Sequence, residues 1–194
     1  MAANRKQDII LAGVGGQGIL SIAFVIDSAA LKEGYNVKQA EVHGMAQRGG
    51  AVQSHLRLSR DRIYSDLIPR GEADLILSVE PLEALRYLDF LRPGGKLITS
   101  STPFINIPDY PDRDALIVEV RRIPGSVVVD SEALAKAAGT SKAQNTVMLG
   151  AAARDLIIGE ENLREFIRVL FAPRGEQILE SNLKAFELGL RAAL

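Results

Sequence analysis

The sequence predicts an α/β fold: a single Rossmann-like, doubly wound domain whose mostly parallel sheet is flanked by helices, with a helical C-terminal third. Two short continuous apolar runs, at residues 8–13 and 73–79, predict buried parallel strands. A glycine-rich turn joins the first run to a helical pattern, as in nucleotide-binding folds. From residue 131 onward the apolar spacing is helical to the end of the chain.

The first predicted element is the strand over 8–13, which runs into Gly-Val-Gly-Gly-Gln-Gly at 13–18. Apolar residues then recur at helical spacing over 19–32, and Gly34 is a residue type that ends helices. A second strand over 35–40 completes a strand–turn–helix–strand unit, which is the building block of a doubly wound sheet.

Residues 51–58 alternate between apolar and polar, which predicts an amphipathic strand with one face exposed to water or to a partner. The buried strand at 73–79 is followed by a proline that favours a helix start, and we expect a helix over 81–90. Arg-Pro-Gly-Gly at 92–95 predicts a turn, and a further strand follows at 96–101.

Residues 102–113 contain three of the eight prolines, so we expect this segment to be irregular. Two β-branched runs, at 115–120 and 126–129, predict short strands. The helical pattern from residue 131 is interrupted by three helix breakers: Gly139, Gly159 and Pro173.

Composition narrows the class of protein. The chain has 194 residues, 47% hydrophobic and 24% charged, and shows no repeat, low-complexity linker or composition shift, so we expect one domain over 1–194. A formal net charge of −1 gives no chain-wide field that would attract nucleic acid or an anionic membrane. No apolar run of about 18 residues occurs, and the polar residues 1–8 leave no room for a signal-peptide core. We therefore expect a cytoplasmic protein without a membrane span.

The absence of cysteine excludes several kinds of site. Without thiolates the chain forms no disulfide, no cysteine-ligated iron–sulfur cluster and no cysteine zinc site. Only two histidines occur, His43 and His55, so we assign no metal ligands. Any redox or metal chemistry in which the protein takes part is expected to be carried by something bound to it.

The glycine turn fits G-x-G-x-x-G between a strand and a helix. Glycines allow a tight turn and a close backbone approach, and free N–H groups at a helix start attract an anion. The residues of this candidate phosphate-binding or subunit-contact turn are Gly13, Gly15, Gly16, Gln17 and Gly18. Glu41, at the end of the second strand, occupies the place of the ribose-binding acid of dinucleotide folds. The alternative is that the glycines only let the helix pack against the strand.

A second loop follows at 41–50, with the sequence Glu-Val-His-Gly-Met-Ala-Gln-Arg-Gly-Gly. An arginine beside two glycines suits a carboxylate or a phosphate, because guanidinium donates two parallel hydrogen bonds. The candidate catalytic residues are Arg48, His43 and Gln47, and the candidate close-approach positions are Gly49 and Gly50. His43 alone is more often a surface or capping residue, and His55 in its alternating strand favours a structural role. The loop as a whole is also compatible with subunit docking without chemistry.

Three motifs together resemble the gamma subunit of 2-oxoacid:ferredoxin oxidoreductases of the pyruvate and ketoisovalerate type. They are the turn at 13–18, the loop at 41–50 and Ser-His-Leu-Arg at 54–57. The form of the second motif is most similar to the beta (small) subunit of indolepyruvate ferredoxin oxidoreductase, which is the same domain. Asn-Thr-Val-Met-Leu-Gly at 145–150 and the helix over 182–189 also fit, so the resemblance covers nearly the whole chain.

The resemblance implies a gamma-type catalytic domain of a complex that converts a 2-oxoacid and coenzyme A to acyl-CoA and carbon dioxide, with ferredoxin as the electron acceptor. Indolepyruvate or another aryl or branched 2-oxoacid is the implied substrate. Thiamine diphosphate with magnesium and iron–sulfur clusters carry out this chemistry in the family. This chain lacks the Gly-Asp-Gly and Asn-Asn pattern of thiamine sites as well as cysteine, so these cofactors are expected on larger partner subunits. We expect the isolated chain to be inactive and able to form a homodimer through its uncovered partner surface.

Two other function classes stay open. One is a freestanding NAD- or flavin-binding oxidoreductase built on the glycine turn and Glu41, although a glycine-rich loop follows Glu41 where a helix is expected. The other is a non-catalytic scaffold subunit with a large apolar patch and no ligand at the turn. The sequence contains no P-loop, no HExxH and no Gly-x-Ser-x-Gly motif.

Overall fold

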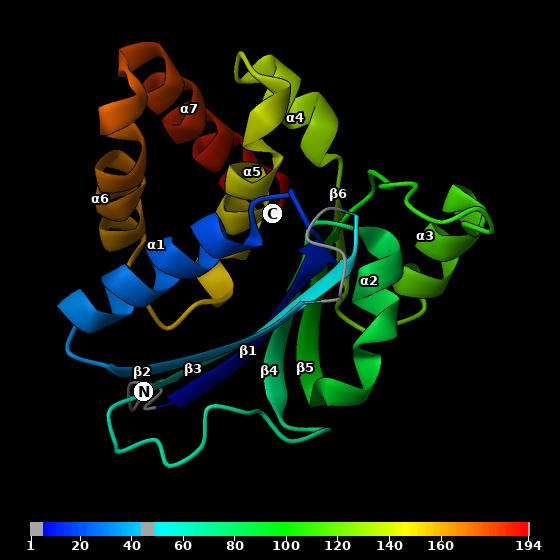
Figure 1. Cartoon of the computed structure of the whole chain (residues 1–194), viewed down its shortest axis with the longest axis horizontal. Coiled ribbons are helices and arrows are strands. Elements are labelled where there is room, and N and C mark those ends of the chain that lie inside the picture. Colours follow the sequence, from blue (N-terminus) through cyan, green and yellow to red (C-terminus); the bar gives the residue numbers. More distant parts are fainter. Residues whose placement is uncertain (1–5, 44–48, 194) are drawn as a thin grey trace.

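The structure is a computed structural model, and it describes residues 6–43 and 49–193 (Figure 1). Within these described residues, six strands form one sheet in the order β2-β3-β1-β4-β5-β6. The strands are β1 (Lys6–Val14), β2 (Asn36–His43), β3 (Ala51–Ser59), β4 (Ala73–Ser78), β5 (Leu91–Ser100) and β6 (Val127–Val129).

Helices cover both faces of the sheet. They are α1 (Ile19–Lys32), α2 (Pro81–Arg86), α3 (Arg113–Arg121), α4 (Ser131–Ala137), α5 (Gln144–Ala152), α6 (Glu160–Phe171) and α7 (Glu176–Ala192). The described part of the chain also contains the short 3-10 helices η1 (Leu88–Phe90), η2 (Ser141–Ala143), η3 (Ala153–Asp155) and η4 (Ala172–Arg174). In Figure 1, α1 and α4 to α7 lie on one face, and α2 and α3 lie on the other. Over the described ranges, no helix is both long and apolar enough to cross a membrane.

The central strand β1 is buried on both faces, which explains its continuous apolar run. Ile9 and Leu11 pack into the larger hydrophobic core, under α1 and the C-terminal helices. Ile10 and Ala12 point the other way, into a smaller core that includes residues of α2 and α3. The predicted doubly wound arrangement with a helical C-terminal third is confirmed.

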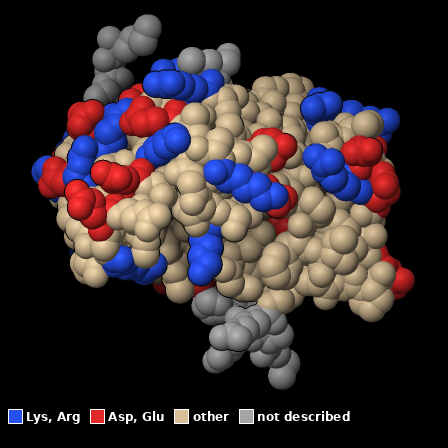
Figure 2. Space-filling model, turned by 90° about the horizontal axis from the view of Figure 1, so that it is seen from above, with Lys and Arg blue, Asp and Glu red and all other residues tan. Residues whose placement is uncertain are grey.

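On the face seen from above, charged side chains gather at the two ends, and surface with fewer charges lies between them (Figure 2).

The topology departs from a simple nucleotide fold at β3. Strands β1, β4, β5 and β6 are parallel neighbours, so the sheet is mostly parallel as predicted. Strand β3 is antiparallel to both β1 and β2 and lies between them. The short loop after β2 allows only a hairpin, because a parallel connection needs a dozen or more residues. The hairpin thereby separates β2 from β1 by one strand.

The prediction of a strand at 115–120 is wrong, because these residues lie in α3. The Asp112 side chain caps this helix by accepting a hydrogen bond from the Ala115 N–H at 3.0 Å. The apolar residues that the helix buries have helical spacing: Leu116, Ile117 and Val120. The cap and this buried stripe outweigh the weak strand preference of β-branched side chains.

Other predicted boundaries of helices, strands and turns agree only in part with those in the structure. The turn predicted at 92–95 lies within β5, which starts at Leu91, and the helix predicted over 81–90 is α2 followed by η1. The strand predicted at 126–129 is confirmed as β6. Of the predicted helix breakers, Gly139 and Gly159 lie between helices, and Pro173 lies in the short η4 that separates α6 from α7.

The polar face of β3 is covered by the chain itself. The His55 side chain is buried; its Nδ1 accepts a hydrogen bond from the Ile68 N–H at 3.1 Å, and its ring meets Phe90 edge-on at 5.2 Å. Arg57 donates two hydrogen bonds to the buried Asp8 carboxylate, at 2.8 and 3.1 Å. The predicted exposure of this face therefore does not hold at His55 and Arg57. Desolvation by burial, followed by the nearby Arg57 charge, lowers the pKa of His55.

Helices α5 and α7 cross at two glycines, Gly150 and Gly189. A Cβ atom on Gly150 would lie 2.1 Å from the Phe186 carbonyl oxygen, and one on Gly189 would lie 1.9 Å from the Val147 carbonyl oxygen. Nearby, the Thr146 hydroxyl donates a buried hydrogen bond of 2.7 Å to the Asn182 side chain. The motifs at 145–150 and 182–189 therefore share a close helix crossing.

Candidate functional site

The glycine turn joins β1 to α1, and its glycines serve different purposes. Gly16 and Gly18 have φ angles of 104° and 80°, in the left-handed region that favours glycine. A Cβ on Gly13 would lie 2.5 Å from Val79 Cγ2, and one on Gly18 would lie 2.5 Å from Asn145 Nδ2. A Cβ on Gly16 would meet nothing within 4 Å. Close packing thus explains Gly13 and contributes at Gly18, whereas Gly16 is required only by its backbone conformation.

Gln17 holds the turn together from inside. Its Oε1 accepts a hydrogen bond from the Val14 N–H at 2.8 Å, and its Nε2 donates to the Val79 carbonyl at 3.4 Å. The side chain therefore links the end of β1 to the end of β4. Both ends of the Gln17 amide are engaged by the chain itself, which supports a structural role for this predicted site residue.

The structure brings the glycine turn against the loop of the β2–β3 hairpin. The Gly15 N–H donates to the Gly50 carbonyl at 2.8 Å, and the Gly49 N–H donates to the Gly15 carbonyl at 3.3 Å. The two sequence motifs therefore meet through their backbones at Gly15, Gly49 and Gly50. Gln47, Arg48 and the side chain of His43 lie outside the described part of the structure.

Glu41 does not occupy the position of a ribose-binding acid. It pairs with Ser54 of β3, and the inserted β3 places it two strands from β1, about 10 Å at the usual strand spacing. In dinucleotide-binding folds the second strand lies next to the first. Glu41 does share a cavity of about 270 Å³ with the glycine turn, on the α1 side. The arrangement argues against a freestanding dinucleotide enzyme.

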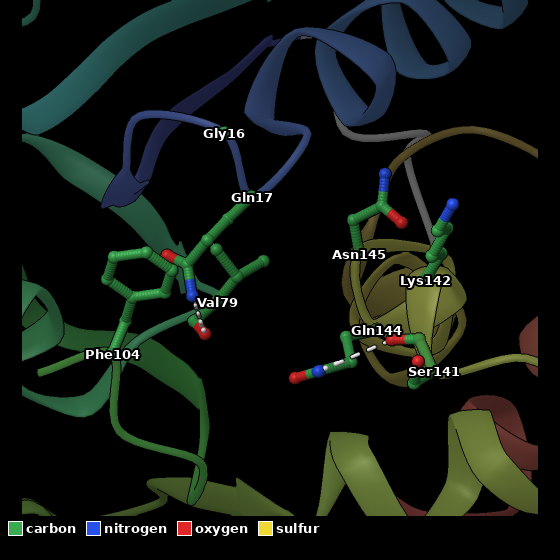
Figure 3. A pocket seen from close by; sticks show the side chains of 8 residues that line it. All are labelled: Gly16, Gln17, Val79, Phe104, Ser141, Lys142, Gln144 and Asn145. Atoms are coloured by element: carbon green, nitrogen blue, oxygen red, sulfur yellow. Dashed lines mark hydrogen bonds between the residues drawn. The ribbon is translucent and has the colours of Figure 1, made fainter. Parts of the chain in front are cut away.

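A larger cleft of about 420 Å³ lies at the carboxyl ends of β1 and β4 (Figure 3). We call it the switch-point cleft, because α1 follows β1 on one face of the sheet and α2 follows β4 on the other. Its lining residues are Gly16, Gln17, Val79, Phe104, Ser141, Lys142, Gln144 and Asn145. Ligands of open α/β sheets bind at such points. None of these residues is acidic and Lys142 is cationic, so the cleft suits an anion.

Glu80, which was not predicted from the sequence, lies beside this cleft and is 1% exposed. Its Oε2 accepts a hydrogen bond from the Glu83 N–H at 2.8 Å and thereby caps α2. Its Oε1 accepts hydrogen bonds from the Phe104 N–H at 3.4 Å and from the Tyr110 hydroxyl. The signal available in the sequence was a Glu-Pro pair at a predicted helix start, which also indicates an ordinary cap.

The described residues do not fit a metal or cluster site. Among them, no three His, Asp or Glu side chains are grouped so that they could hold a metal ion, and the sequence has no cysteine. The buried acids near the cleft are already used within the protein, since Glu80 caps α2 and Glu83 accepts hydrogen bonds from Arg86. The chemistry that the site supports is the binding of an anion between the glycine turn and Lys142.

The family model described as pyruvate ferredoxin/flavodoxin oxidoreductase matches residues 8–192. The chain belongs to this family. Indolepyruvate oxidoreductase subunit IorB of Thermococcus kodakarensis is 39% identical, over 97% of this chain and 96% of the relative. The family resemblance seen in the sequence motifs is therefore confirmed.

Two solved structures show the same fold as this member of the pyruvate ferredoxin/flavodoxin oxidoreductase family. The gamma subunit of keto/oxoacid ferredoxin oxidoreductase from Geobacter sulfurreducens has a TM-score of 0.69 and 24% identity, over 96% of this chain and 98% of its own. The 2-oxoglutarate:ferredoxin oxidoreductase of Magnetococcus marinus, solved with 2-oxoglutarate, coenzyme A and succinyl-CoA bound, has a TM-score of 0.77 and 23% identity. The match covers 98% of this chain but only 31% of that longer chain.

Proposed function

We propose that this chain is the small, gamma-type subunit of a cytoplasmic 2-oxoacid:ferredoxin oxidoreductase and forms one catalytic domain of that complex. The observation that carries the proposal is similarity along the whole chain to a relative named as an oxidoreductase subunit, 39% identical over 97% of this chain. The larger partner subunit holds thiamine diphosphate, magnesium and iron–sulfur clusters, and the small chain is inactive without it. The absence of cysteine supports this division.

The proposed reaction joins the acyl group of a 2-oxoacid to coenzyme A. The 2-oxoacid anion and the thiol give acyl-CoA, carbon dioxide, one proton and two electrons, and the electrons pass to ferredoxin. Indolepyruvate, or another aryl or branched 2-oxoacid, is the proposed substrate because the 39% identical relative is named for indolepyruvate.

We place the phosphates of coenzyme A at the switch-point cleft. The glycine turn and the start of α1 offer backbone N–H groups, Lys142 offers a positive charge, and none of the described lining residues is acidic. Coenzyme A carries phosphates, whereas the 2-oxoacid carries a single carboxylate, so the site suits the acyl acceptor better. Arg48, with His43 and Gln47, is proposed to reach the same ligand from the hairpin loop. The alternative is that the turn and the loop only form the subunit contact.

The subunit assignment is tested by purifying the tagged chain anaerobically from its own cells. We expect a complex well above 21.0 kDa that contains thiamine and iron. A lone chain or a homodimer without either cofactor, obtained under low-salt conditions that preserve weak complexes, would contradict the assignment.

The role of the cleft is tested with Lys142→Gln in the complex. Loss of one charge-assisted contact to phosphate costs about 1.4 kcal/mol, so we expect a roughly tenfold higher KM for coenzyme A and an unchanged KM for the 2-oxoacid. Lys184→Gln is the matched control, because Lys184 is exposed on α7 and does not line the cleft. If Lys142→Gln leaves both KM values unchanged, the cleft does not bind coenzyme A. Loss of assembly in Arg48→Ala would assign the hairpin loop to subunit contact.

A further inference from the structure

We propose that Glu80, Asn106 and Tyr110 are positioning residues that hold the segment 101–112, here called the strap, against the cleft and the hairpin loop. The strap connects β5 to α3, and its Phe104 forms part of the wall of the switch-point cleft. The inference rests on the function proposed above, because positioning matters only if the cleft takes a ligand.

The two ends of the strap are fastened to each other and to the sheet. The Ser101 N–H donates to the Val129 carbonyl of β6 at 2.8 Å. The Arg113 Nε donates to the Ser101 carbonyl at 3.0 Å, which joins the first residue of α3 to the start of the strap. The strap is thus a loop with closed ends, and such loops are frequently functional.

Glu80 fastens the strap from the inside. Its buried carboxylate accepts hydrogen bonds from the Phe104 N–H and the Tyr110 hydroxyl, on opposite sides of the strap tip. A buried carboxylate needs such donors to offset the loss of its hydration. Burial first, and then the hydrogen bond to Glu80, raises the pKa of Tyr110, so the hydroxyl stays protonated and remains a donor at neutral pH.

Asn106 carries the connection from the strap to the hairpin loop. Its Nδ2 donates to the Gly49 carbonyl at 2.7 Å, while the Gly49 N–H donates to Gly15 at 3.3 Å. The strap, the hairpin loop and the glycine turn are therefore linked by consecutive hydrogen bonds around the cleft. Gly49 is held from both sides, next in sequence to Arg48.

Burial of apolar side chains does not account for the conformation of the strap. Three large apolar side chains of the strap stay exposed, by 40%, 73% and 40%: Phe104, Ile105 and Ile107. Burying such side chains would stabilise the fold by about 1.5–3 kcal/mol each. The strap instead donates hydrogen bonds to Glu80 and to the Gly49 carbonyl, at the edge of the cleft. This arrangement favours a role in shaping the cleft.

The test compares Asn106→Ala and Asn106→Asp in the complex with the larger subunit. Aspartate keeps the size of asparagine but removes the donor, so we expect both variants to raise the KM for coenzyme A by about tenfold. The mass of the complex is expected to stay unchanged, and the melting temperature of the chain is expected to fall by no more than about 2–4 °C, the effect of losing one hydrogen bond. Tyr110→Phe, which removes only the hydroxyl that binds Glu80, is expected to raise the same KM by about threefold.

Asn36→Ala is the matched control. The Asn36 side chain also donates to backbone carbonyls, of Arg60 at 3.3 Å and Asp61 at 3.1 Å, but it lies at the start of β2, away from the cleft. This variant is expected to leave every KM unchanged.

The outcomes separate this inference from the proposed function. If Lys142→Gln raises the KM for coenzyme A and the Asn106 variants behave like Asn36→Ala, the positioning role is wrong and the proposed function stands. A lower melting temperature with unchanged KM values would show that Asn106 is only structural, which also overturns the inference. A wild-type chain that forms no complex overturns both.

Discussion

The crossing of α5 and α7 makes a strong quantitative prediction, because Gly189→Ala has no room for its methyl group. The new Cβ would lie 1.9 Å from the Val147 carbonyl oxygen, 2.8 Å from its carbonyl carbon and 3.0 Å from the Ala151 nitrogen. All three are backbone atoms, so no flexible side chain can move aside. Ordinary contacts of a Cβ begin near 3.4 Å, and the two helices must therefore separate or shift locally by about 1.5 Å.

The expected cost follows from three contributions. Overpacking a close-packed core costs about 1–3 kcal/mol, and this site lies at the upper end because the backbone itself must move. Separation of the helices also weakens the buried hydrogen bond from Thr146 to Asn182, worth about 1 kcal/mol. Alanine gains about 1 kcal/mol over glycine as a helix former, which offsets part of the loss. We expect Gly189→Ala to destabilise the chain by about 3 kcal/mol.

Urea denaturation of the purified chain, followed by circular dichroism at 222 nm, measures this change. For a domain of this size about 3 kcal/mol corresponds to a melting temperature lower by about 6–12 °C. Lys184→Ala on the same helix is the control, because its side chain is exposed and its change should stay within about 0.5 kcal/mol.

Gly150→Ala tests the same contact from the other helix, where the new Cβ would lie 2.1 Å from the Phe186 carbonyl oxygen. Once one methyl group has forced the helices apart, the second meets less resistance, so the double variant should cost less than the sum of the two single variants. A Gly189→Ala chain as stable as the wild type, or strict additivity in the double variant, would refute this account of the crossing.

Two further predictions concern pH. Burial raises the pKa of Asp27 to about 7 from 3.8, and its Oδ1 has no hydrogen-bond partner within the described residues. The protein should therefore lose stability as pH rises from about 4 to 7, and Asp27→Asn should gain about 2–4 kcal/mol at pH 8 and almost nothing at pH 4 in urea denaturation. Burial lowers the pKa of His55 instead. The neutral ring therefore contributes to the stability of the fold above about pH 6.5, and this contribution is lost as the pH falls through the lowered pKa. The His55→Gln chain should be less stable than the wild type at pH 8, with a smaller difference at pH 5, by the same method.

Each pH prediction is judged on the difference between variant and wild type, because other groups titrate in the same range. For Asp27→Asn, an equal gain at pH 4 and pH 8 would mean that the carboxyl does not titrate differently in the folded state. For His55→Gln, a loss of stability that is the same at both pH values would show that the ring matters for packing but not for its charge.

Local signals in the sequence predicted the parts of the fold that depend on near neighbours. The continuous apolar run of β1, the glycine turn into α1 and the helical spacing after residue 131 all involve residues within a few positions of each other. The same signals failed at 115–120, where the cap at Asp112 and the packing of α3 decided between two local conformations that differ little in intrinsic preference.

The sequence identified the two loop motifs as candidate functional segments, but it did not indicate that they meet or what their residues do. It could not indicate that Gln17 is engaged by Val14 and Val79, because Val79 lies far away along the chain. It could not indicate the place of Glu41 either, since this depends on the insertion of β3 between β1 and β2. For Glu80 the sequence indicated only a helix cap. Its second role, accepting a hydrogen bond from Phe104, depends on the strap that folds over it.

The sequence by itself determined the family, the α/β class and the glycine turn, because motif identity and periodicity are properties of the chain that survive without its fold. The tertiary structure alone decided the order of the strands, the tight crossing at Gly150 and Gly189 and the hydrogen bonds that join the strap to Gly49. These features depend on residues that lie far apart in the chain. Their free energy comes from packing and burial, which no local pattern encodes.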